Sequence, residues 1–492
     1  LTTDEINYAQ VISTHLLRKE KHMFIINALI AFGNWFWGIP ILILLGCGGL
    51  YVTIRVGFLQ FRHFGYICSQ TFGKMFAKPE TDDGVSPFAA ACTALASSIG
   101  ASNIVGVPVA IALGGPGAVF WIWVMAFIGM ATKYTEVTLG LMYREKNEAG
   151  DFVGGPYYYC RGLGKSGLAK KIGIFFGTFY AFGLMIELIP SIASQAASVT
   201  KQGISLGIPE LPIAITVAII TIIVCIGGVK RIGDVCDKLV PVMAIVYMLG
   251  ALVIIVKNFN QIPNAFAEIF GSAFTGRAAF GGFAGASLGA ALRWGFARGC
   301  YSNEAGMGTA PQGHAAANVD HPVRQGLWGV FEVTVDTIIV CTVTALAVLV
   351  SGVWTEKGID AGALAQAAFS KNFNPTFANY FVAICVFLFV LSTIIVVTFY
   401  GQRQAEFLFG IGFSKIWVWV YIIATVVGGL GIDLGVLYSL TDAFLGLIII
   451  PNMIAVVLMV PQVKKAQDEF FNTPGKYYLA DKAAKAAKKA AK

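Results

Sequence analysis

Charged residues are scarce in this chain. They make up 13% of its 492 residues, whereas soluble domains contain about 25%. Hydrophobic residues reach 57%, and no polar segment as large as a soluble domain separates the apolar stretches. These stretches are about 20 residues long, the length that crosses a bilayer as a helix. The composition excludes a soluble globular enzyme and predicts an all-α, multi-pass membrane protein surrounded by lipids.

Signatures of enzymes and metal centres are also missing. The cysteines are scattered and form no Cys-x-x-Cys pair, which disfavours a disulfide framework or a metal site. His314 and His321 lack metal-ligand or catalytic-triad spacing, and no glycine-rich loop ends in Gly-Lys-Ser/Thr. The net charge of +8 is concentrated in loops and in the last residues, where anionic lipids account for it. We therefore expect neither enzymatic activity nor a nucleic-acid partner.

Eleven membrane-spanning helices are predicted from apolar windows that end where charges, proline and glycine cluster. The windows are residues 35–56, 86–114, 116–143, 173–199, 211–229, 239–257, 276–298, 325–354, 377–401, 416–431 and 434–461. Most Lys and Arg residues fall on one side of this layout, and cytoplasmic loops are the ones enriched in them. The sequence thus predicts a protein of the cell inner membrane or plasma membrane, with its N-terminus outside and its C-terminus in the cytoplasm.

The second window contains an unusual cluster of hydroxyl groups, an amide, glycines and a proline at mid-membrane depth. Pro108 removes a backbone donor, while Gly100 and Gly106 permit unwinding or close approach. An unwound stretch exposes amides and carbonyls that bind a substrate carboxylate and a cation. Alternatively, the small residues form a packing face and Asn103 is tied to a neighbouring helix. The residues alone leave both interpretations open.

The seventh window combines glycines with a hydroxyl in the same way, at Gly281, Gly282, Gly285 and Ser287. Small residues four apart are also a common helix-packing pattern. Two interrupted windows five apart are, however, expected of two inverted five-helix repeats preceded by one extra helix. The motif Ser-Asn-x-x-Gly also occurs twice, at residues 102–106 and 302–306, but inverted repeats rarely keep sequence identity.

The inverted repeats give the predicted organisation of the chain. It comprises a polar N-terminal tail (1–34), an extra transmembrane helix and loop (35–85), a first five-helix repeat (86–258), a second (259–461) and a basic cytoplasmic tail (462–492).

The ninth window carries adjacent hydroxyl groups, Ser392 and Thr393, in an otherwise apolar helix. Such hydroxyls often bond to carbonyls of their own helix. They also serve as oxygen ligands for a hard cation, together with carbonyls of an unwound helix. The two roles are compatible, and Ser98 of the second window is a further candidate ligand.

Charged residues inside the predicted spans are few and therefore informative. Lys133 and Glu136 lie three apart on one helix, so we expect them to pair. Asp336 and Asp442 are expected to cap helices or pair within the bundle. Glu187 has no cation near it in sequence, so three roles remain open for it: proton coupling, contact with a substrate ammonium, or a hydrogen bond to an adjacent helix.

Several long motifs resemble those of the alanine or glycine:cation symporter family, over about residues 30–462. They are Gly-Ala-Ser-Asn-Ile-Val-Gly at 100–106, Gly-Gly-Pro-Gly-Ala-Val-Phe-Trp at 114–121, Gly-Gly-Pro-Tyr-Tyr-Tyr at 154–159, Arg-Gly-Cys-Tyr-Ser-Asn-Glu-Ala-Gly-Met-Gly-Thr-Ala-Pro at 298–311, and Asp-His-Pro-Val-Arg-Gln-Gly-Leu at 320–327. The resemblance implies a fold similar to that of the leucine transporter, with the substrate between the second and seventh windows. It also implies a sodium site between the unwound second window and Ser392 with Thr393.

The resemblance implies a symporter that couples Na⁺ to uptake of a small neutral amino acid such as alanine or glycine. We expect Gly100, Ala101, Ser102, Asn103, Gly106, Gly281, Gly282, Gly285 and Glu187 to bind the substrate, and Ser392, Thr393 and Ser98 to bind the cation. The chain departs from the family pattern at Ala101 and Ser102, at Pro108, and around Glu187, where an amide-rich stretch is usual. Three alternatives remain open. The substrate could be a larger amino acid such as glutamine, the coupling ion could be H⁺, or the protein could be a channel. No oligomer is required.

Overall fold

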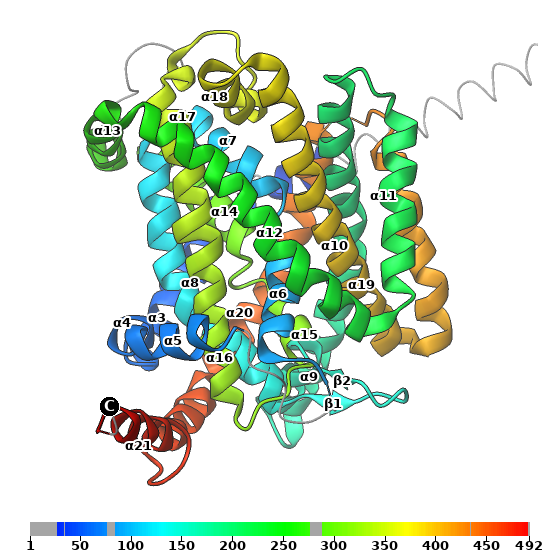
Figure 1. Cartoon of the computed structure of the whole chain (residues 1–492). Coiled ribbons are helices and arrows are strands. Elements are labelled where there is room, and N and C mark those ends of the chain that lie inside the picture. Colours follow the sequence, from blue (N-terminus) through cyan, green and yellow to red (C-terminus); the bar gives the residue numbers. More distant parts are fainter. Residues whose placement is uncertain (1–26, 34, 76–83, 276–287, 433, 491–492) are drawn as a thin grey trace, which may run out of the picture.

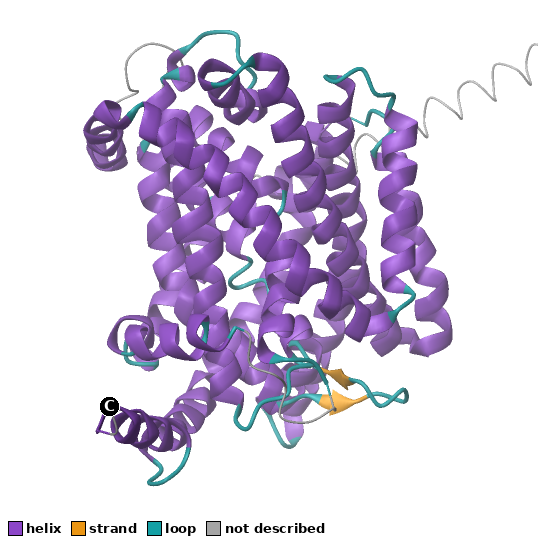
Figure 2. Ribbon diagram, viewed as in Figure 1, coloured by secondary structure: helices purple, strands orange, loops and turns teal. Residues whose placement is uncertain are grey.

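The computed structural model describes residues 27–33, 35–75, 84–275, 288–432 and 434–490, and most of them are helical (Figure 1). The strands β1 (Glu145–Lys146) and β2 (Phe152–Val153) pair antiparallel in a small hairpin at the lower edge of the molecule (Figure 2). The prediction of an all-α membrane protein is thereby confirmed.

Six helices of the described residues are long and apolar enough to cross a membrane. They are α8 (Gly117–Met142), α10 (Gly167–Ile204), α12 (Gly228–Lys257), the continuous run of α16 (Pro322–Val333), η6 (Thr334–Cys341) and α17 (Thr342–Ser351), α19 (Pro375–Gly428) and α20 (Leu434–Asn472). A broken seventh span consists of α6 (Pro87–Ser98), η3 (Ser102–Gly106) and α7 (Val107–Gly114), bent by 49°. Shorter apolar helices are the run of α2 (Ile39–Ile41), η1 (Leu42–Cys47) and α3 (Gly48–Arg55), and α11 (Glu210–Cys225).

The remaining elements are short connections and surface helices. They are α4 (Leu59–Arg62), α5 (Phe64–Gln70), η2 (Phe72–Lys74), α9 (Pro156–Tyr159), η4 (Cys160–Leu163), η5 (Phe259–Gln261), α13 (Ile262–Thr275), α14 (Leu288–Asn303), α15 (Ala310–His314), η7 (Val353–Thr355), η8 (Ala361–Ala363), α18 (Leu364–Asn372) and α21 (Tyr477–Ala490).

Most of the described residues in the predicted windows lie in helices. Residues 276–287 of the seventh window lie outside the described residues, and α14 contains the rest of that window. The ninth and tenth windows both lie in α19. Gly410 divides α19 into two arms, because its backbone (φ 84°, ψ 170°) leaves the helical region in a way that glycine tolerates best.

Helix starts follow local sequence signals. Ser86 accepts a hydrogen bond from the amide of Ala89 and caps α6, whose first residue is a proline. Asn374 caps α19 in the same way, again directly before a proline. These caps fix where the chain enters the two helices that later meet at the candidate site.

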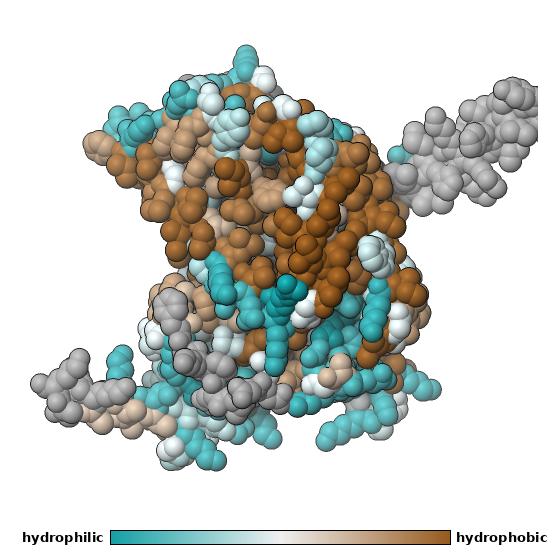
Figure 3. All heavy atoms as spheres, turned by 45° about the vertical axis from the view of Figure 1, so that its right-hand side comes forward, coloured by the Kyte–Doolittle hydropathy of each residue, from teal (hydrophilic) through white to brown (hydrophobic). Residues whose placement is uncertain are grey.

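Apolar side chains cover the faces that point away from the bundle. Ile215, Ile219 and Ile223 form an exposed stripe at four-residue spacing along α11. Figure 3 shows such residues as a broad hydrophobic band across the middle of the molecule, with hydrophilic side chains gathered below it. This surface suits a lipid environment.

The C-terminal segment is docked on the bundle. Helix α20 continues to Asn472, well past the end of the predicted eleventh window, and α21 follows it. Asp481 of α21 accepts hydrogen bonds from Tyr66 (2.7 Å) and Arg324 (2.8 Å). The predicted basic tail is thus anchored to α5 and α16 up to at least Asp481.

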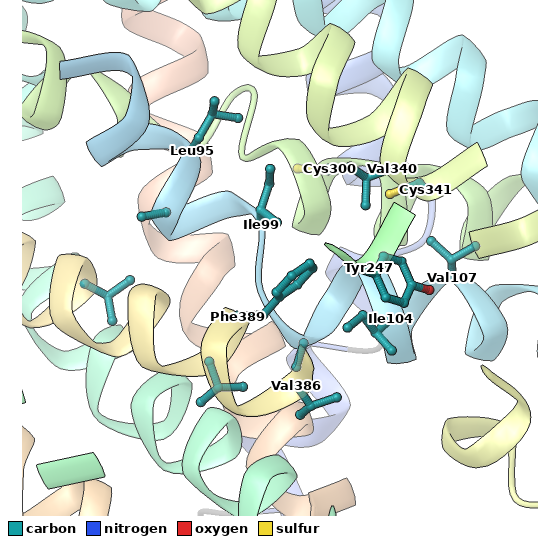
Figure 4. Close-up of a cluster of buried hydrophobic side chains, with 14 of the residues drawn as sticks. Leu95, Ile99, Ile104, Val107, Tyr247, Cys300, Val340, Cys341, Val386 and Phe389 are labelled. Atoms are coloured by element: carbon teal, nitrogen blue, oxygen red, sulfur yellow. The ribbon is translucent and has the colours of Figure 1, made fainter. Parts of the chain in front are cut away.

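A continuous apolar core surrounds the bend of the broken span. Figure 4 shows Ile99 and Ile104 from either side of the bend, together with Tyr247 of α12 and Phe389 of α19. The rings of Tyr247 and Phe389 pack edge to face, with centroids 5.7 Å apart. The polar residues of the bend are therefore enclosed by helices on several sides.

The contact between α10 and α19 yields a stability prediction. A Cβ atom on Gly428 would lie 2.4 Å from the backbone Cα of Ala193, so the two helices would have to separate. We expect Gly428→Ala to destabilise the protein by about 1–3 kcal/mol. Gly412→Ala is the matched control, because no atom lies within 4 Å of that position. Thermal unfolding of the detergent-purified variants, followed by tryptophan fluorescence, provides the measurement. Equal melting temperatures would contradict this account of the packing.

Candidate functional site

The second span is broken at the residues where the sequence predicted an interruption. Helix α6 ends at Ser98, and Ile99 leaves the helical conformation (φ −76°, ψ 86°). The amide of Gly100 donates to Asn103 Oδ1 (3.1 Å), and that of Ala101 donates to Gln195 Oε1 of α10 (3.4 Å). Two backbone donors of the break are thus satisfied by side-chain oxygens.

A second break faces the first, in the loop between α14 and α15. Glu304, Gly306 and Gly308 all have positive φ values, of 56°, 93° and 74°. Asn103 of the first break donates to Ser302, which directly precedes the second (3.2 Å). The two copies of the Ser-Asn motif therefore lie where the two breaks meet. The predicted break at Gly281, Gly282 and Gly285 lies outside the described residues.

A small cavity of about 40 Å³ lies between the two breaks. It has room for about three water molecules. It is lined by Ser97, Ser98, Ser102, Glu187, Leu188, Ser191, Gln195, Tyr301, Glu304, Met307, Thr309, Thr393, Val397, Leu445 and Ile448. The lining combines two carboxylates and many hydroxyls with an apolar wall. None of the described residues in the lining is Lys, Arg or His, so the cavity suits a small ligand with a positively charged group.

Glu304 is the functional candidate that sequence reasoning missed. Its carboxylate accepts hydrogen bonds from Ser97 (3.0 Å) and Thr309 (2.6 Å) and is buried. A positive φ is uncommon for a residue with a long side chain and marks an enforced conformation. The sequence does contain a signal for Glu304: an acidic residue among glycines in the motif at 298–311. The predicted spans placed that part of the motif in a loop, so it was not considered as a site residue.

Lys133 and Glu136 hold this loop from α8. Lys133 donates to the carbonyl of Asn303 at the C-terminus of α14 (2.8 Å), where a cation is favourable. Glu136 accepts hydrogen bonds from the amides of Gly306 and Gly308, both at 3.1 Å. The prediction that Lys133 and Glu136 pair with each other was wrong, because each reaches a different part of the adjacent loop.

Asn452 of α20 completes the support of the loop. Its amide donates to Glu136 (2.5 Å) and to the carbonyl of Gly306 (2.8 Å), and its oxygen accepts from Tyr159. One residue of the last span therefore connects the loop to the carboxylate that holds it.

Glu187 lines the cavity from α10. It lies on one helix face with Ser191 and Gln195, at four-residue spacing, and Ser191 is within hydrogen-bonding range of its carboxylate. Among the described residues, no Lys, Arg or His lies within ion-pair distance of Glu187, although its side chain is only 3% exposed. The carboxylate therefore has capacity for a donor from within the cavity.

Thr393 is the predicted cation ligand that reaches the break. Its hydroxyl lies 3.0 Å from the carbonyl of Ala96 in α6 and 3.0 Å from that of Phe389 in its own helix, and its single hydrogen can be donated to either. Ser98 also lines the cavity, with its hydroxyl 3.3 Å from the carbonyls of Ala94 and Leu95. Ser392 points away: its hydroxyl donates to Phe389 (2.8 Å) and contacts the sulfur of Met243 in α12 (3.5 Å).

Neither Asn103 nor Gly106 is among the described residues that line the cavity. The amide of Asn103 donates to Asp336 Oδ1 (2.7 Å), and Ser302 donates to the other oxygen of that carboxylate (2.6 Å). Asn103 lies in η3 and Asp336 in η6, so two wide helical turns of the π type are joined at this point. Asn103 thus ties two spans together, as the packing interpretation of the sequence expected.

Comparisons with known proteins identify relatives of this chain among membrane transporters. The chain is 47% identical over 451 residues to the uncharacterized transporter YflA of Bacillus subtilis (strain 168), covering 91% of this chain and 94% of that protein. It is 38% identical over 435 residues to the sodium/alanine symporter AgcS of Methanococcus maripaludis, covering 87% and 93%. It is 35% identical over 427 residues to the probable sodium/glutamine symporter GlnT of Bacillus subtilis (strain 168), covering 86% of each chain. The sequence model that describes the sodium:alanine symporter family matches residues 22–483 of this chain. The chain belongs to the sodium:alanine symporter family.

Proposed function

We propose that this transporter is a symporter that couples the Na⁺ gradient to uptake of a small neutral amino acid, alanine or glycine. One observation carries the proposal: a small cavity lined by carboxylates and hydroxyls as well as apolar side chains lies where two interrupted spans meet, and Thr393 of its lining contacts the carbonyl of Ala96. A charge crossing 100 mV releases about 2.3 kcal/mol, to which the sodium concentration ratio adds. Membership of a transporter family, which includes the sodium/alanine symporter AgcS, supports this function over that of an enzyme.

The proposed architecture is that of two inverted five-helix repeats, residues 86–258 and 259–461, after one extra helix. Six long apolar helices and one broken span among the described residues, together with interrupted segments at residues 99–106 and 304–308, support the arrangement. The proposed orientation places the C-terminus in the cytoplasm, because the loops and tail on that side carry most of the Lys and Arg residues.

The substrate carboxylate binds the backbone amides around Gly100, Ala101 and Ser102 in this proposal. These amides lie at the N-terminal end of η3 and α7, where the helix dipole favours negative charge. The side-chain oxygens of Asn103 and Gln195 now occupy two of them, so binding requires these oxygens to be displaced. Gly281, Gly282, Gly285 and Gly106 are proposed to shape the pocket.

The substrate ammonium group faces the carboxylates of Glu187 and Glu304. The apolar wall of Leu188, Leu445 and Ile448 faces the substrate side chain, and the cavity has to widen when the substrate binds because it is smaller than an amino acid. Glutamine is the second candidate substrate, since GlnT is a probable sodium/glutamine symporter and carboxylates accept hydrogen bonds from amides.

Removal of the hydroxyl groups of α19 tests the cation site. We expect Thr393→Val to weaken apparent Na⁺ affinity at least tenfold in proteoliposome uptake of labelled alanine, because it deletes the oxygen that reaches the break. Ser392→Ala alone should have a smaller effect, and the double variant should resemble Thr393→Val. Thr425→Val is the matched control, because that hydroxyl bonds only within the second arm of α19. Unchanged sodium dependence in the double variant would reject the site.

The same uptake assay distinguishes transport mechanisms. A symporter gives saturable uptake that requires the Na⁺ gradient, together with labelled-alanine exchange when the gradient is absent. Non-saturable flux would indicate a channel instead, and gradient-driven uptake in sodium-free buffer would indicate H⁺ as the coupling ion.

Substitution of Glu187 tests substrate recognition. Glu187→Gln keeps the size of the side chain but deletes its charge, so we expect the KM for alanine to rise about tenfold with little change in melting temperature. Ser191→Ala is the control for a purely local hydrogen bond and should change the KM less. Wild-type uptake by Glu187→Gln from pH 5.5 to 8.5 would leave Glu187 with a structural role only.

A further inference from the structure

A second and larger cavity, of about 380 Å³, lies beside the β1–β2 hairpin. It is enclosed by the hairpin, by the turn between α11 and α12, and by the two arms of α19 on either side of Gly410. Its lining shares no described residue with the candidate site. Figure 1 shows the hairpin near the lower ends of α11 and α19, at the end of the molecule where the C-terminus lies. The proposed transport function leaves this cavity without a role.

One wall of the cavity is apolar and reaches the lipid-facing surface. Ile222 and Ile226 contribute to it from the end of α11, and Val418 and Trp419 from the second arm of α19. Ile226 is 79% exposed and Trp419 is 55% exposed. Tryptophan is enriched where the hydrocarbon of a membrane meets the headgroups, because its ring is amphipathic. This wall therefore suits contact with an acyl chain near the membrane boundary.

The other wall is polar and is organised by Arg403. Its guanidinium donates to Asp151 Oδ2 (2.7 Å) and to Glu406 Oε2 (2.8 Å), and Asn147 donates to Glu406 Oε1 (2.7 Å). These contacts fix the hairpin to the first arm of α19. The Arg403 side chain is only 11% exposed, and two carboxylates compensate its charge. Arg403 therefore holds the wall together and is not free to bind an anion.

Two charged groups of the lining keep binding capacity. No described residue forms an ion pair or a hydrogen bond with the ammonium of Lys415, which is exposed. Asp151 Oδ1 likewise accepts no hydrogen bond from the described part of the chain, since Arg403 contacts Oδ2. The side-chain amide of Gln402 also lines the cavity and can donate. These groups complement a ligand that carries both an anion and an ammonium group.

We propose that this cavity binds a phospholipid with an amine headgroup, phosphatidylethanolamine, from the leaflet on the side of the C-terminus. The phosphate accepts hydrogen bonds from Lys415 and Gln402, the headgroup ammonium donates to Asp151 Oδ1, and one acyl chain lies against Ile226 and Trp419. Hydrogen bonds between charged groups are roughly twice as strong as neutral ones. The inference requires a membrane around the chain and is independent of the substrate and the coupling ion.

Other phospholipid headgroups match the lining less well. Basic pockets between spans do bind acidic headgroups, but here Arg403 is already paired and Asp151 repels further negative charge. Lys230 and Arg231 are exposed near the start of α12 and are not part of the lining. A choline headgroup carries its charge on a trimethylated nitrogen, which has no N–H group to donate to Asp151.

Native mass spectrometry of the detergent-purified full chain tests the lipid preference. Phosphatidylethanolamine, phosphatidylcholine and phosphatidylglycerol with identical acyl chains are titrated separately. We expect one phosphatidylethanolamine to bind with a Kd about tenfold lower than that of either other lipid, because only it satisfies both charged groups. Equal binding of the three lipids, or tighter binding of phosphatidylglycerol, would overturn the proposal. Glycerophosphoethanolamine lacks acyl chains, and binding of this compound as tight as that of the lipid would overturn a membrane source.

Variants assign the lipid to this cavity. Lys415→Gln should weaken phosphatidylethanolamine binding about tenfold. Asp151→Asn keeps an oxygen for Arg403 but removes the negative charge, so it should abolish the preference over phosphatidylcholine. Lys357→Gln is the matched control, because Lys357 is an exposed lysine outside the lining. An unchanged preference in both folded pocket variants would overturn the assignment.

A second measurement avoids changes to the polar wall. Bromine atoms on the acyl chains of phosphatidylethanolamine quench the fluorescence of nearby tryptophan. We expect the quenching caused by the first bound lipid to fall in Trp419→Phe, because Trp419 lines the cavity. Equal quenching in the variant and in the unaltered protein would place the lipid elsewhere and overturn the proposal.

Discussion

A buried carboxylate determines where the chain opens beside the cavity. Glu136 accepts hydrogen bonds from the amides of Gly306 and Gly308 and from the side chain of Asn452. Each buried donor left without a partner would cost about 1–3 kcal/mol, so these contacts make a non-helical loop tolerable in the middle of a membrane bundle. The loop in turn gives Glu304 its conformation and its place in the cavity wall. The rest of the site depends on this support from α8 and α20.

The two breaks are fixed to each other as well as to their surroundings. Asn103 and Ser302 share the carboxylate of Asp336, so hydrogen bonds join the break of the second span, the end of α14 and the wide turns of η6. On the opposite side, the contact between Thr393 and Ala96 connects the first break to α19. A cation bound at that contact would hold together helices from both proposed repeats.

The sequence predicted the class of protein, the positions of most spans and the break between α6 and η3. These features depend on local properties: apolar length, glycine, proline and polar residues at mid-membrane depth. The partners of Lys133 were not predictable in this way, because they come from a loop about 170 positions away. Glu304 was missed for a related reason. Its importance arises from a positive φ and from Ser97, a residue of a different span.

The ninth window shows most clearly which features cannot be predicted from the sequence. Ser392 and Thr393 are adjacent and chemically similar, so their sequence gives no reason to separate them. A helix turns by about 100° per residue, and this rotation directs Thr393 toward the break and Ser392 toward Met243. Only the placement of α6 and α12 around α19 distinguishes the two hydroxyls.

The volume of the cavity has a consequence for selectivity. At about 40 Å³ the space is smaller than any amino acid, alanine included, so a substrate can enter only if the surrounding helices separate. Leu188 on α10 and Leu445 with Ile448 on α20 form part of its wall, and interiors packed at this density resist expansion. The free energy needed to separate the helices rises with the size of the substrate. A large substrate would therefore be rejected because whole helices would have to move further apart. Residues far from the cavity that stiffen or loosen the α10 and α20 interface would then tune which substrates are admitted.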